Sequence, residues 1–373
     1  MTITCIAGRT IVVTLFDPIT IGSLHLRNRV MRSATAEFLA DRDTGAPTPE
    51  MGRMYRELAE GEVGLIVTGH TCVSFSGRAH PRMAAIANDD LISPWREVIR
   101  PAQEAGGRVM MQINHAGANA DPEATPDPLS PSGVATNDLV EPRAMTEEQI
   151  QKVVTDFGEA ARRVREAGFD GVQIHGAHGY LTTQFLTPKT NLRQDRWGGN
   201  EGRRSAFLKA IAAEVRRQVG PDYPVWIKLG VAGSEDSGLD MEEGARVANR
   251  CTNYAIDCIE ISFALGRPEW MDLDTEAPLF PLADAVRDAV GPDYPLGLVY
   301  GFRTRQCMEA VLNSGVAQMI SLCRPLIAEP DLVHKMEQGL SDEVACTRCD
   351  LCRSGEDEEG IVCRNEAVQQ SLA

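Results

Sequence analysis

The chain has 373 residues and a formal net charge of -16 at pH 7. Its length and its hydrophobic content of 43% are enough for one large globular domain or two ordinary ones. The negative charge and the lack of a basic stripe argue against a protein that binds nucleic acid. No apolar run reaches the length of about 18 residues that a membrane span needs, and residues 1–16 have no basic segment before their short apolar stretch. We therefore expect a cytoplasmic protein that acts on a small-molecule substrate.

Apolar segments of strand length recur along the chain and alternate with segments of helical periodicity. The strand segments are 29–34, 63–68, 108–114, 170–175, 224–229, 257–262, 295–300 and 317–322. In the helical segment that precedes the fourth strand, Thr146 and Gln149 form a capping-box pattern and Gly168 marks the end of the helix. Eight strand–helix units predict a fold of the α/β class, a (β/α)8 TIM barrel.

The sequence GPDYP occurs twice, at 220–224 and 291–295, each time between a predicted helix and a predicted strand. A doubly wound sheet is the alternative architecture, but such a sheet normally carries G-x-G-x-x-G after its first strand, and none follows segment 29–34. We expect a single barrel domain at 15–340, an N-terminal extension at 1–14 and a cysteine-rich tail at 341–373.

The longest interruption between predicted elements is residues 116–145, after the third strand, and this segment is rich in Pro, Asp, Ser and Gly. A loop of this length in a barrel is usually a lid or a binding loop, and disorder is the alternative.

Polar residues at the C-terminal ends of the strands are the candidates for an active site, because barrels place their active sites there. These residues are His70, Gln112, His115, His175, His178, Lys228 and Arg324. The convergence of several histidines at one rim favours a functional pocket. A metal site at the H-x-x-H pair is the alternative, but it needs a third ligand, and Lys228 and Gln112 are poor choices.

Five segments resemble the Old Yellow Enzyme family of flavin-dependent ene-reductases, in the family's order and over about residues 15–364. They are LFDPITIGSLHLRNRVMRSAT, EGEVGLIVTGHTCVSFSGR, VMMQINHAG, GFDGVQIHGAHGYLTTQFLTPKTNLRQDRWGG and LCRPLIAEPDL. The resemblance implies an FMN-dependent oxidoreductase that uses NAD(P)H to reduce an activated C=C bond of an α,β-unsaturated carbonyl or nitro compound in two half-reactions. We also expect a homo-oligomer.

The resemblance implies that FMN lies across the top of the barrel. Its implied contacts are Ala34, Thr35, Ala36, Gly69, His70, Gln112, His175, Lys228, Tyr300, Gly301, Cys323 and Arg324. An amide can both donate to and accept from the pyrimidine edge, and a cation near N1 and O2 stabilises the reduced flavin. Three of these positions depart from the family. Ala36 stands where relatives carry Thr or Cys, a role that Thr35 takes if the register differs by one, and Tyr300 and Cys323 stand where glycine is usual.

The resemblance also implies the catalytic residues. His175 and His178 would hydrogen-bond the oxygen of the acceptor, and Tyr180 would protonate its α-carbon. An aromatic ring that only packs against the substrate is the alternative reading of Tyr180.

Four cysteines close together near the C-terminus, Cys346, Cys349, Cys352 and Cys363, could hold a [4Fe-4S] cluster or zinc, or could be free thiols. Larger relatives carry a cluster here with C-x2-C-x3-C-x11-C spacing, and two gaps in this chain are one residue shorter. A cluster would fit a second hypothesis, a flavin-dependent amine or N-methyl dehydrogenase or demethylase that passes electrons to a separate electron-transfer partner. A flavin-free, metal-dependent barrel lyase is the third.

Overall fold

The structure, a computed structural model, describes residues 12–353 and 360–372. The predicted N-terminal extension lies outside the described residues up to residue 11, and residues 354–359 of the predicted tail lie outside them as well. The strands are β1 (Ile19–Ile21), β2 (Leu24–Leu26), β3 (Val30–Arg32), β4 (Leu65–Val67), β5 (Thr71–Cys72), β6 (Val109–Asn114), β7 (Leu129–Ser130), β8 (Arg143–Ala144), β9 (Gly171–Gly176), β10 (Val225–Ala232), β11 (Cys258–Phe263), β12 (Leu296–Val299) and β13 (Met319–Leu322).

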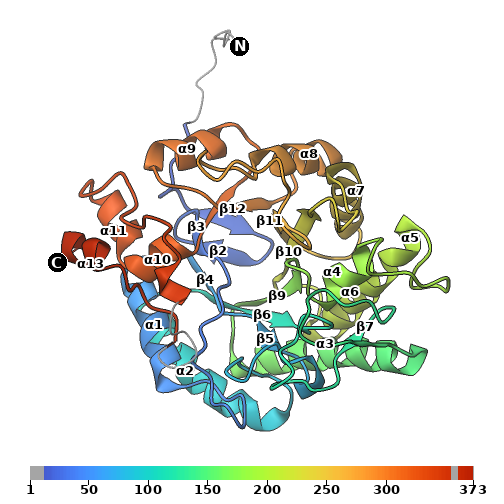
Figure 1. The fold of residues 1–373 in the computed structure, drawn as a ribbon. Helices are drawn as coiled ribbons and strands as arrows, with labels where there is room; N and C mark the ends of the chain where they lie inside the picture. The colour runs from blue at the N-terminus through green and yellow to red at the C-terminus, as the bar shows by residue number, and fades with distance from the viewer. Residues whose placement is uncertain (1–11, 354–359, 373) are drawn as a thin grey trace.

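Eight parallel strands form a closed barrel at the centre of the molecule (Figure 1). Around the barrel, β3, β4, β6, β9, β10, β11, β12 and β13 pair in this order, and β13 pairs with β3 to close it, with Ile320 opposite Val30. The short strand β5 adds to the end of β6. All eight predicted strand segments are confirmed, and so is the (β/α)8 TIM barrel.

The helices surround this barrel (Figure 1). They are α1 (Pro49–Glu60), α2 (Ile92–Glu104), α3 (Glu147–Ala167), α4 (Leu181–Leu186), α5 (Glu201–Arg204), α6 (Ala206–Val219), α7 (Met241–Cys251), α8 (Phe280–Val290), α9 (Arg305–Asn313), α10 (Arg324–Ala328), α11 (Leu332–Glu337) and α13 (Glu366–Leu372). The predicted capping box of α3 is confirmed, since Thr146 and Gln149 exchange hydrogen bonds of 2.9 and 3.3 Å. Gly168 ends this helix with a φ of 92°, a value that favours glycine.

The two GPDYP segments form equivalent turns. The first joins α6 to β10 and the second joins α8 to β12. The Tyr223 hydroxyl donates to the Phe169 carbonyl oxygen at 2.8 Å, and the Tyr294 hydroxyl donates to the Ile256 carbonyl oxygen at 2.6 Å. Each tyrosine therefore ties its turn to the chain entering the preceding barrel strand, so the repeated tyrosine has the same role in both turns.

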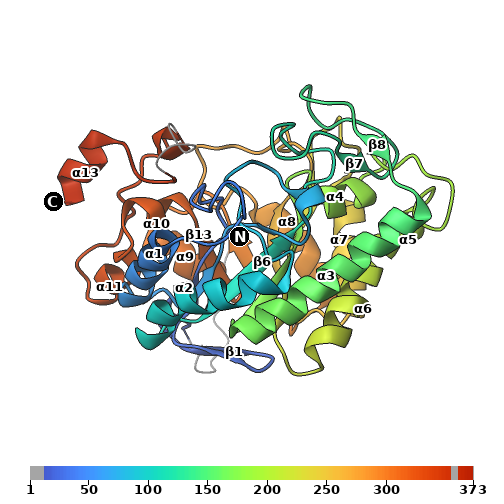
Figure 2. The same cartoon turned by 90° about the horizontal axis from the view of Figure 1, so that it is seen from below.

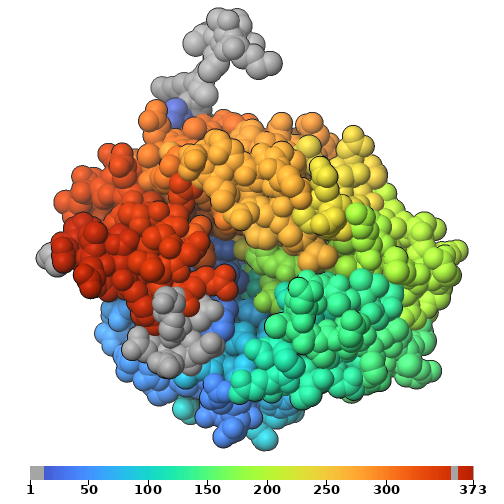
Figure 3. Space-filling model, viewed as in Figure 1, coloured from blue at the N-terminus to red at the C-terminus, as the bar shows by residue number. Residues whose placement is uncertain are grey.

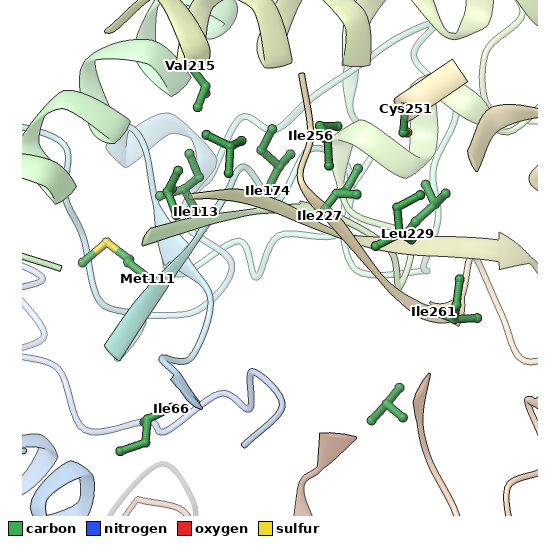
Figure 4. Packing of buried hydrophobic residues seen from close by; sticks show 14 of the residues in the cluster. Ile66, Met111, Ile113, Ile174, Val215, Ile227, Leu229, Cys251, Ile256 and Ile261 are labelled. Carbon is green, nitrogen blue, oxygen red and sulfur yellow. The ribbon is translucent and has the colours of Figure 1, made fainter. Parts of the chain in front are cut away.

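The hydrophobic core has two parts, because successive side chains of a strand point to opposite faces. Outward-pointing residues such as Ile113, Ile174 and Ile227 pack under the helices (Figure 4). A second cluster contains Met110 and Trp226, with other barrel residues and the β1–β2 hairpin. Figure 2 shows this hairpin at one end of the barrel and the C-terminal tail, β7 and β8 at the other end.

The long segment 116–145 is folded and contains β7 and β8, which pair in parallel. None of its residues lines the large cavity described below, but Asn119 Nδ2 donates to the carbonyl oxygen of the cavity residue His178 at 3.5 Å. The role of a lid or binding loop stays a prediction. Within residues 12–353 and 360–372, no helix combines the length and the apolar character needed to cross a bilayer.

Candidate functional site

A cavity of about 610 Å³ opens at the C-terminal ends of the barrel strands, and the space-filling view is hollowed at its centre (Figure 3). The sequence-predicted residues that line the cavity are Ala34, Thr35, Ala36, His70, Gln112, His175, His178, Tyr180, Lys228, Tyr300, Cys323 and Arg324. Gly301 lines an adjoining cavity at the ends of β12 and β13. Gly69 lines neither; its backbone N–H donates to the Glu37 carboxylate at 2.7 Å.

Strand alternation explains why polar groups gather under this cavity. Side chains two positions apart point to the same face of a strand. On β10, Trp226 lies in the apolar interior cluster and Lys228 lines the cavity one step later. On β11, Cys258 lies in the same apolar cluster, followed by Glu260 and then by Ser262 at the cavity wall. An apolar layer thus supports a polar layer at the open end, as expected for a barrel interior filled in layers.

A buried ion pair lies in the polar layer. Lys228 Nζ donates to Glu260 Oε1 at 3.0 Å and to Ser33 Oγ at 2.5 Å, and Ser33 Oγ donates to Glu260 Oε1 at 2.7 Å. Lys228 is 2% exposed and Glu260 is fully buried. An ammonium group has three N–H donors, so one donor of Lys228 is left for a ligand in the cavity.

Two glutamines extend this network across the barrel. Gln173 Nε2 donates to Glu260 Oε2 at 3.0 Å, and Gln173 Oε1 accepts a hydrogen bond from Gln112 Nε2 at 2.7 Å. The amide of Gln112 is therefore fixed in orientation, which leaves its oxygen and its second N–H for a ligand.

The two histidines of the H-x-x-H pair are held as neutral rings. His175 Nδ1 accepts the Ala177 N–H at 3.3 Å, so Nε2 carries the ring proton. His178 Nε2 lies 2.8 Å from Ser262 Oγ. If the serine donates in this bond, His178 Nδ1 carries the proton, and each imidazole then has one N–H for an acceptor oxygen.

Burial keeps these histidines neutral. Desolvation lowers the pKa of His175 well below its ordinary value, with further contributions from the His178, His70 and Lys228 charges. Burial, aided by Lys228, lowers the pKa of His178 to about 3, and burial lowers that of His70 to about 4. Near pH 7 all three rings are therefore hydrogen-bond donors without charge.

Tyr180 lies beside this histidine cluster. Its ring centroid lies 5.0 Å from that of His70 and 4.9 Å from that of His175. Burial raises the pKa of Tyr180 to about 12, and the Arg353 charge opposes this rise. The phenol stays protonated near neutral pH, as a proton donor must.

The adjoining cavity has the features of an anion site. It is lined by Gly301, Ser321, Arg324 and Arg348 among others, and the buried Ser321 hydroxyl has no hydrogen-bond partner among the described residues. Arg324 pairs with Asp350 at 2.5 Å. Tyr300, where the family usually has glycine, adopts a φ of 91° in the left-handed region.

The histidines at the cavity differ from the predicted set in two respects. His115 does not line the cavity; it is fully buried, and its Nδ1 accepts the Gly117 N–H at 3.1 Å. His80, which the sequence analysis did not select, lines the cavity and stacks on Phe38 with ring centroids 4.0 Å apart. His80 follows the loop after β5 and belongs to no predicted element, so neither periodicity nor strand position identified it.

The tail forms part of the cavity wall, although none of its residues belongs to a barrel strand. Asp350, Cys352, Arg353 and Ile361 line the large cavity, and the Ile361 N–H donates to the Glu37 carbonyl oxygen at 3.0 Å. The cavity wall therefore includes residues of the tail as well as residues at the ends of the barrel strands.

The predicted cysteine ligands lie around one small cavity beside α10. This cavity is lined by Cys346, Cys349, Cys352 and Cys363 together with Arg324 and other residues. Burial raises the pKa of Cys346 and raises that of Cys352 to about 11, whereas a hydrogen bond from Asn365 lowers the pKa of Cys349. Within the described part of the chain, no three His, Cys, Asp or Glu side chains are placed as a metal-binding group. The four thiols therefore converge without the geometry of a metal centre.

The residues of the two connected cavities fit an FMN. The spare donor of Lys228 and the fixed amide of Gln112 suit the pyrimidine edge of a flavin. The unpartnered Ser321 hydroxyl and Arg324 suit a phosphate. This donor set matches the chemistry of FMN at both ends, the flavin ring and the phosphate.

Comparisons with known proteins agree with a flavin site in this chain. Residues 14–343 match the NADH:flavin oxidoreductase / NADH oxidase family. Among curated proteins, the probable NADH-dependent flavin oxidoreductase YqiG of Bacillus subtilis (strain 168) is 31% identical over 342 residues, which are 88% of this chain and 89% of that protein.

Two solved structures have similar folds. The old yellow enzyme homologue from Zymomonas mobilis has a TM-score of 0.78 and 27% identity, over 90% of this chain and 95% of that one. A 2-naphthoyl-CoA reductase complex has a TM-score of 0.88 and 24% identity, over 96% of this chain. The chain spans only 57% of the length of that reductase, and at this identity the likeness concerns the fold alone.

Proposed function

Because the chain belongs to the NADH:flavin oxidoreductase / NADH oxidase family, the Old Yellow Enzyme family of FMN-dependent NAD(P)H oxidoreductases, we propose that it reduces an activated C=C bond of an α,β-unsaturated carbonyl or nitro compound. The observation that carries the proposal is the pair of neutral imidazoles beside a protonated phenol in one cavity. When bound, FMN supplies hydride transfer from NAD(P)H to the acceptor.

The cofactor would be held by groups that the structure places around the cavities. Lys228 would meet N1 and O2, Gln112 the pyrimidine edge, and Arg324 with Gly301 the phosphate. Ala34, Thr35, Ala36 and Cys323 would contact the ring from the ends of β3 and β13. The Thr35 hydroxyl donates to the Ser33 carbonyl oxygen at 3.1 Å and lies 2.9 Å from Cys323 Sγ, and it would give up the bond to Ser33 to take the place of the side chain that Ala36 lacks.

The acceptor would be oriented by the histidines. His175 and His178 would each donate one N–H to its carbonyl or nitro oxygen, where negative charge develops during reduction. Donors of this kind are worth about 2.7 to 4 kcal/mol in the transition state. Tyr180 would then give its hydroxyl proton to the α-carbon, on the side of the cavity where the His70 and His175 rings hold it.

The test of this proposal begins with the visible spectrum of the purified protein, which should show bound flavin. The protein should then be mixed anaerobically with NADH or NADPH and afterwards with 2-cyclohexenone. We expect the flavin to bleach with a nicotinamide and to regain its colour with the enone, with cyclohexanone as the product. Bleaching by a nicotinamide without reoxidation by enones or nitroalkenes would contradict the ene-reductase proposal.

Binding of a phenol tests the oxygen site separately. A phenolate mimics the oxygen that the two histidines would hold, and the H175A/H178A variant should lose its binding to the oxidised flavoprotein. The matched control is H25N, because His25 lies exposed on the β1–β2 hairpin at the other end of the barrel. Unchanged phenol affinity in H175A/H178A would refute the role of the pair.

For the tail we propose metal binding, with a [4Fe-4S] cluster ahead of zinc, although the four thiols as described are not placed as a metal-binding group and would have to move together to hold one. A cluster would fit the second candidate function, electron transfer from an amine or N-methyl substrate to a separate carrier. Its specific support is the position of Cys352, which lines both the thiol cavity and the large cavity. Iron and zinc analysis of anaerobically purified protein decides it. Flavin bleaching by a methylated amine, but not by either nicotinamide, would favour the dehydrogenase, and absence of both metals would leave free thiols.

A further inference from the structure

The polar layer of the barrel contains a fully buried carboxylate that the proposed chemistry does not use. Glu260 lies on β11, next to Lys228 on β10 in the parallel register of the two strands. Its Oε1 accepts from Lys228 and Ser33, and its Oε2 accepts from Gln173. Both oxygens are thus occupied, and Glu260 itself lies outside the set of residues that line the cavity.

We infer that Glu260 is a positioning residue that sets the reduction potential of the bound flavin through Lys228. The inference rests on FMN binding, which the family provides, and not on the identity of the acceptor. Glu260 holds one end of Lys228 at 3.0 Å, and through Gln173 it also fixes Gln112, the second group expected at the pyrimidine edge.

The physical argument is electrostatic. An unpaired ammonium group beside N1 and O2 would strongly favour the reduced, anionic flavin. A carboxylate 3.0 Å from that ammonium offsets much of its charge, and the offset is large because burial limits screening by water. Glu260 therefore keeps the potential of the flavin lower than Lys228 alone would set it.

Because both groups are buried, the charge of Lys228 and the charge of Glu260 are compatible with a stable fold only when both are present. A buried charge without its partner is strongly destabilising, whereas removal of both charges together is often tolerated. The cluster supplies Glu260 with three donors and Lys228 with two acceptors, so the arrangement is rigid enough to fix the distance on which the electrostatic effect depends.

The test compares the flavin potentials of wild-type and E260Q holoprotein in an anaerobic titration against a reference dye. The glutamine keeps the shape of the side chain and removes its charge. We expect E260Q to favour reduced over oxidised FMN by a further factor of at least about ten, which for a two-electron couple is a rise of about 30 mV. An unchanged or lowered potential overturns the inference.

Sulfite binding gives a second measurement that requires no substrate. Sulfite adds its lone pair to flavin N5, and the negative charge moves to N1 and O2, beside Lys228. E260Q should bind sulfite at least about tenfold more tightly than the wild type, in line with the shift in potential. Equal sulfite affinities would contradict a charge effect even if the catalytic rate had changed.

The matched control is E329Q. Glu329 is also buried, at 4% exposed, and its Oε1 accepts from Lys335 Nζ at 2.8 Å, but it lines neither the large cavity nor the anion cavity. This variant makes the same chemical change beside another lysine, and it should leave the potential and the sulfite affinity at their wild-type values. A shift of equal size in E329Q would show that the effect in E260Q is not local.

A double variant keeps the inference testable if E260Q does not fold. K228M/E260Q removes both charges, which is tolerated better than removal of one, and its potential should stay within about 30 mV of the wild type, because the two charges largely offset each other at the flavin. A potential of K228M/E260Q raised above the wild type by as much as that predicted for E260Q would overturn the inference, because the rise could not then come from an unpaired Lys228. Enone reduction enters none of these measurements, so failure of the proposed substrate class would be distinguishable from failure of this inference.

Discussion

His178 and Ser262 join two neighbouring parts of the cavity wall, the loop after β9 and the end of β11, through a 2.8 Å contact between His178 Nε2 and Ser262 Oγ. The contact holds a histidine whose backbone φ of 58° is uncommon for a residue with a side chain. Ser262 therefore helps to hold the position of His178, and when the serine hydroxyl donates it also places the ring proton of His178 on Nδ1.

Replacement of Ser262 by alanine should weaken the oxygen site without removing it. The lost hydrogen bond is worth about 1 kcal/mol, so we expect S262A to bind phenol about fivefold more weakly than the wild type. Fluorescence or absorbance titration of the oxidised flavoprotein measures the change. The control is S314A, which loses a 2.7 Å bond to the Val311 carbonyl oxygen outside the cavity and should bind phenol normally.

Replacement of Tyr180 by phenylalanine should separate the two half-reactions. The proton donor is lost but the ring remains, so we expect the oxidation of the reduced flavin by an enone to slow by about 10²- to 10⁴-fold. Reduction of the flavin by NADPH should keep its wild-type rate in stopped-flow measurements. If Tyr180 only packs against the substrate, both half-reactions of Y180F will match those of the wild type and of the control Y254F.

Asp350 should compete with the phosphate for Arg324. Its carboxylate lies 2.5 Å from the Arg324 guanidinium, and a bound phosphate would bring further negative charge to the same place. Since exposed ion pairs are worth up to about 1 kcal/mol, we expect D350N to bind FMN up to about fivefold more tightly, by titration of the apoprotein. D342N, which changes an acid paired with Arg305 at 3.7 Å, should leave FMN affinity unchanged.

Acid should destabilise the fold through the buried histidines. Burial lowers the pKa of His70 to about 4, whereas an unfolded histidine titrates near 6.5. The unfolded state therefore binds more protons between these values, so the free energy of unfolding falls as pH falls below about 6.5. At pH 5 the loss from one such group is on the order of 1 to 2 kcal/mol.

Urea unfolding at pH 7.5 and pH 5.0 measures this acid sensitivity. The unfolding midpoint of H70N should change less between the two pH values than that of the wild type. H25N alters an exposed histidine and should behave as the wild type does. Equal acid sensitivity of H70N and the wild type would contradict the assignment to His70.

The barrel was predictable because its signals are local. Each central strand is buried on both faces and reads as a short apolar run, and the two GPDYP turns mark two of the strand starts. The position of Lys228 at the cavity was predicted from its place near the end of the segment 224–229, although β10 continues to Ala232. Strand ends can be located in the sequence, and closure of the barrel brings these ends close together in space.

Residues outside the strand ends were harder to identify. His80 and Arg353 reach the cavity from an irregular loop and from the tail, whose paths depend on tertiary contacts rather than on local periodicity. Glu260 did carry a signal, an acidic residue within the apolar run DCIEIS, because a buried acid requires a partner. Gly69 was selected from its place in a motif, but the motif gave no sign that its N–H donates to the Glu37 carboxylate instead of facing the cavity.

The contribution of Cys352, Arg353 and Ile361 to the cavity wall has a practical consequence for enzyme engineering. Substrate range in this scaffold need not be altered through the barrel, where each replacement disturbs a packed interior. Exchange of the tail segment, or a library confined to these positions, would reshape one wall of the cavity while the barrel strands stay intact.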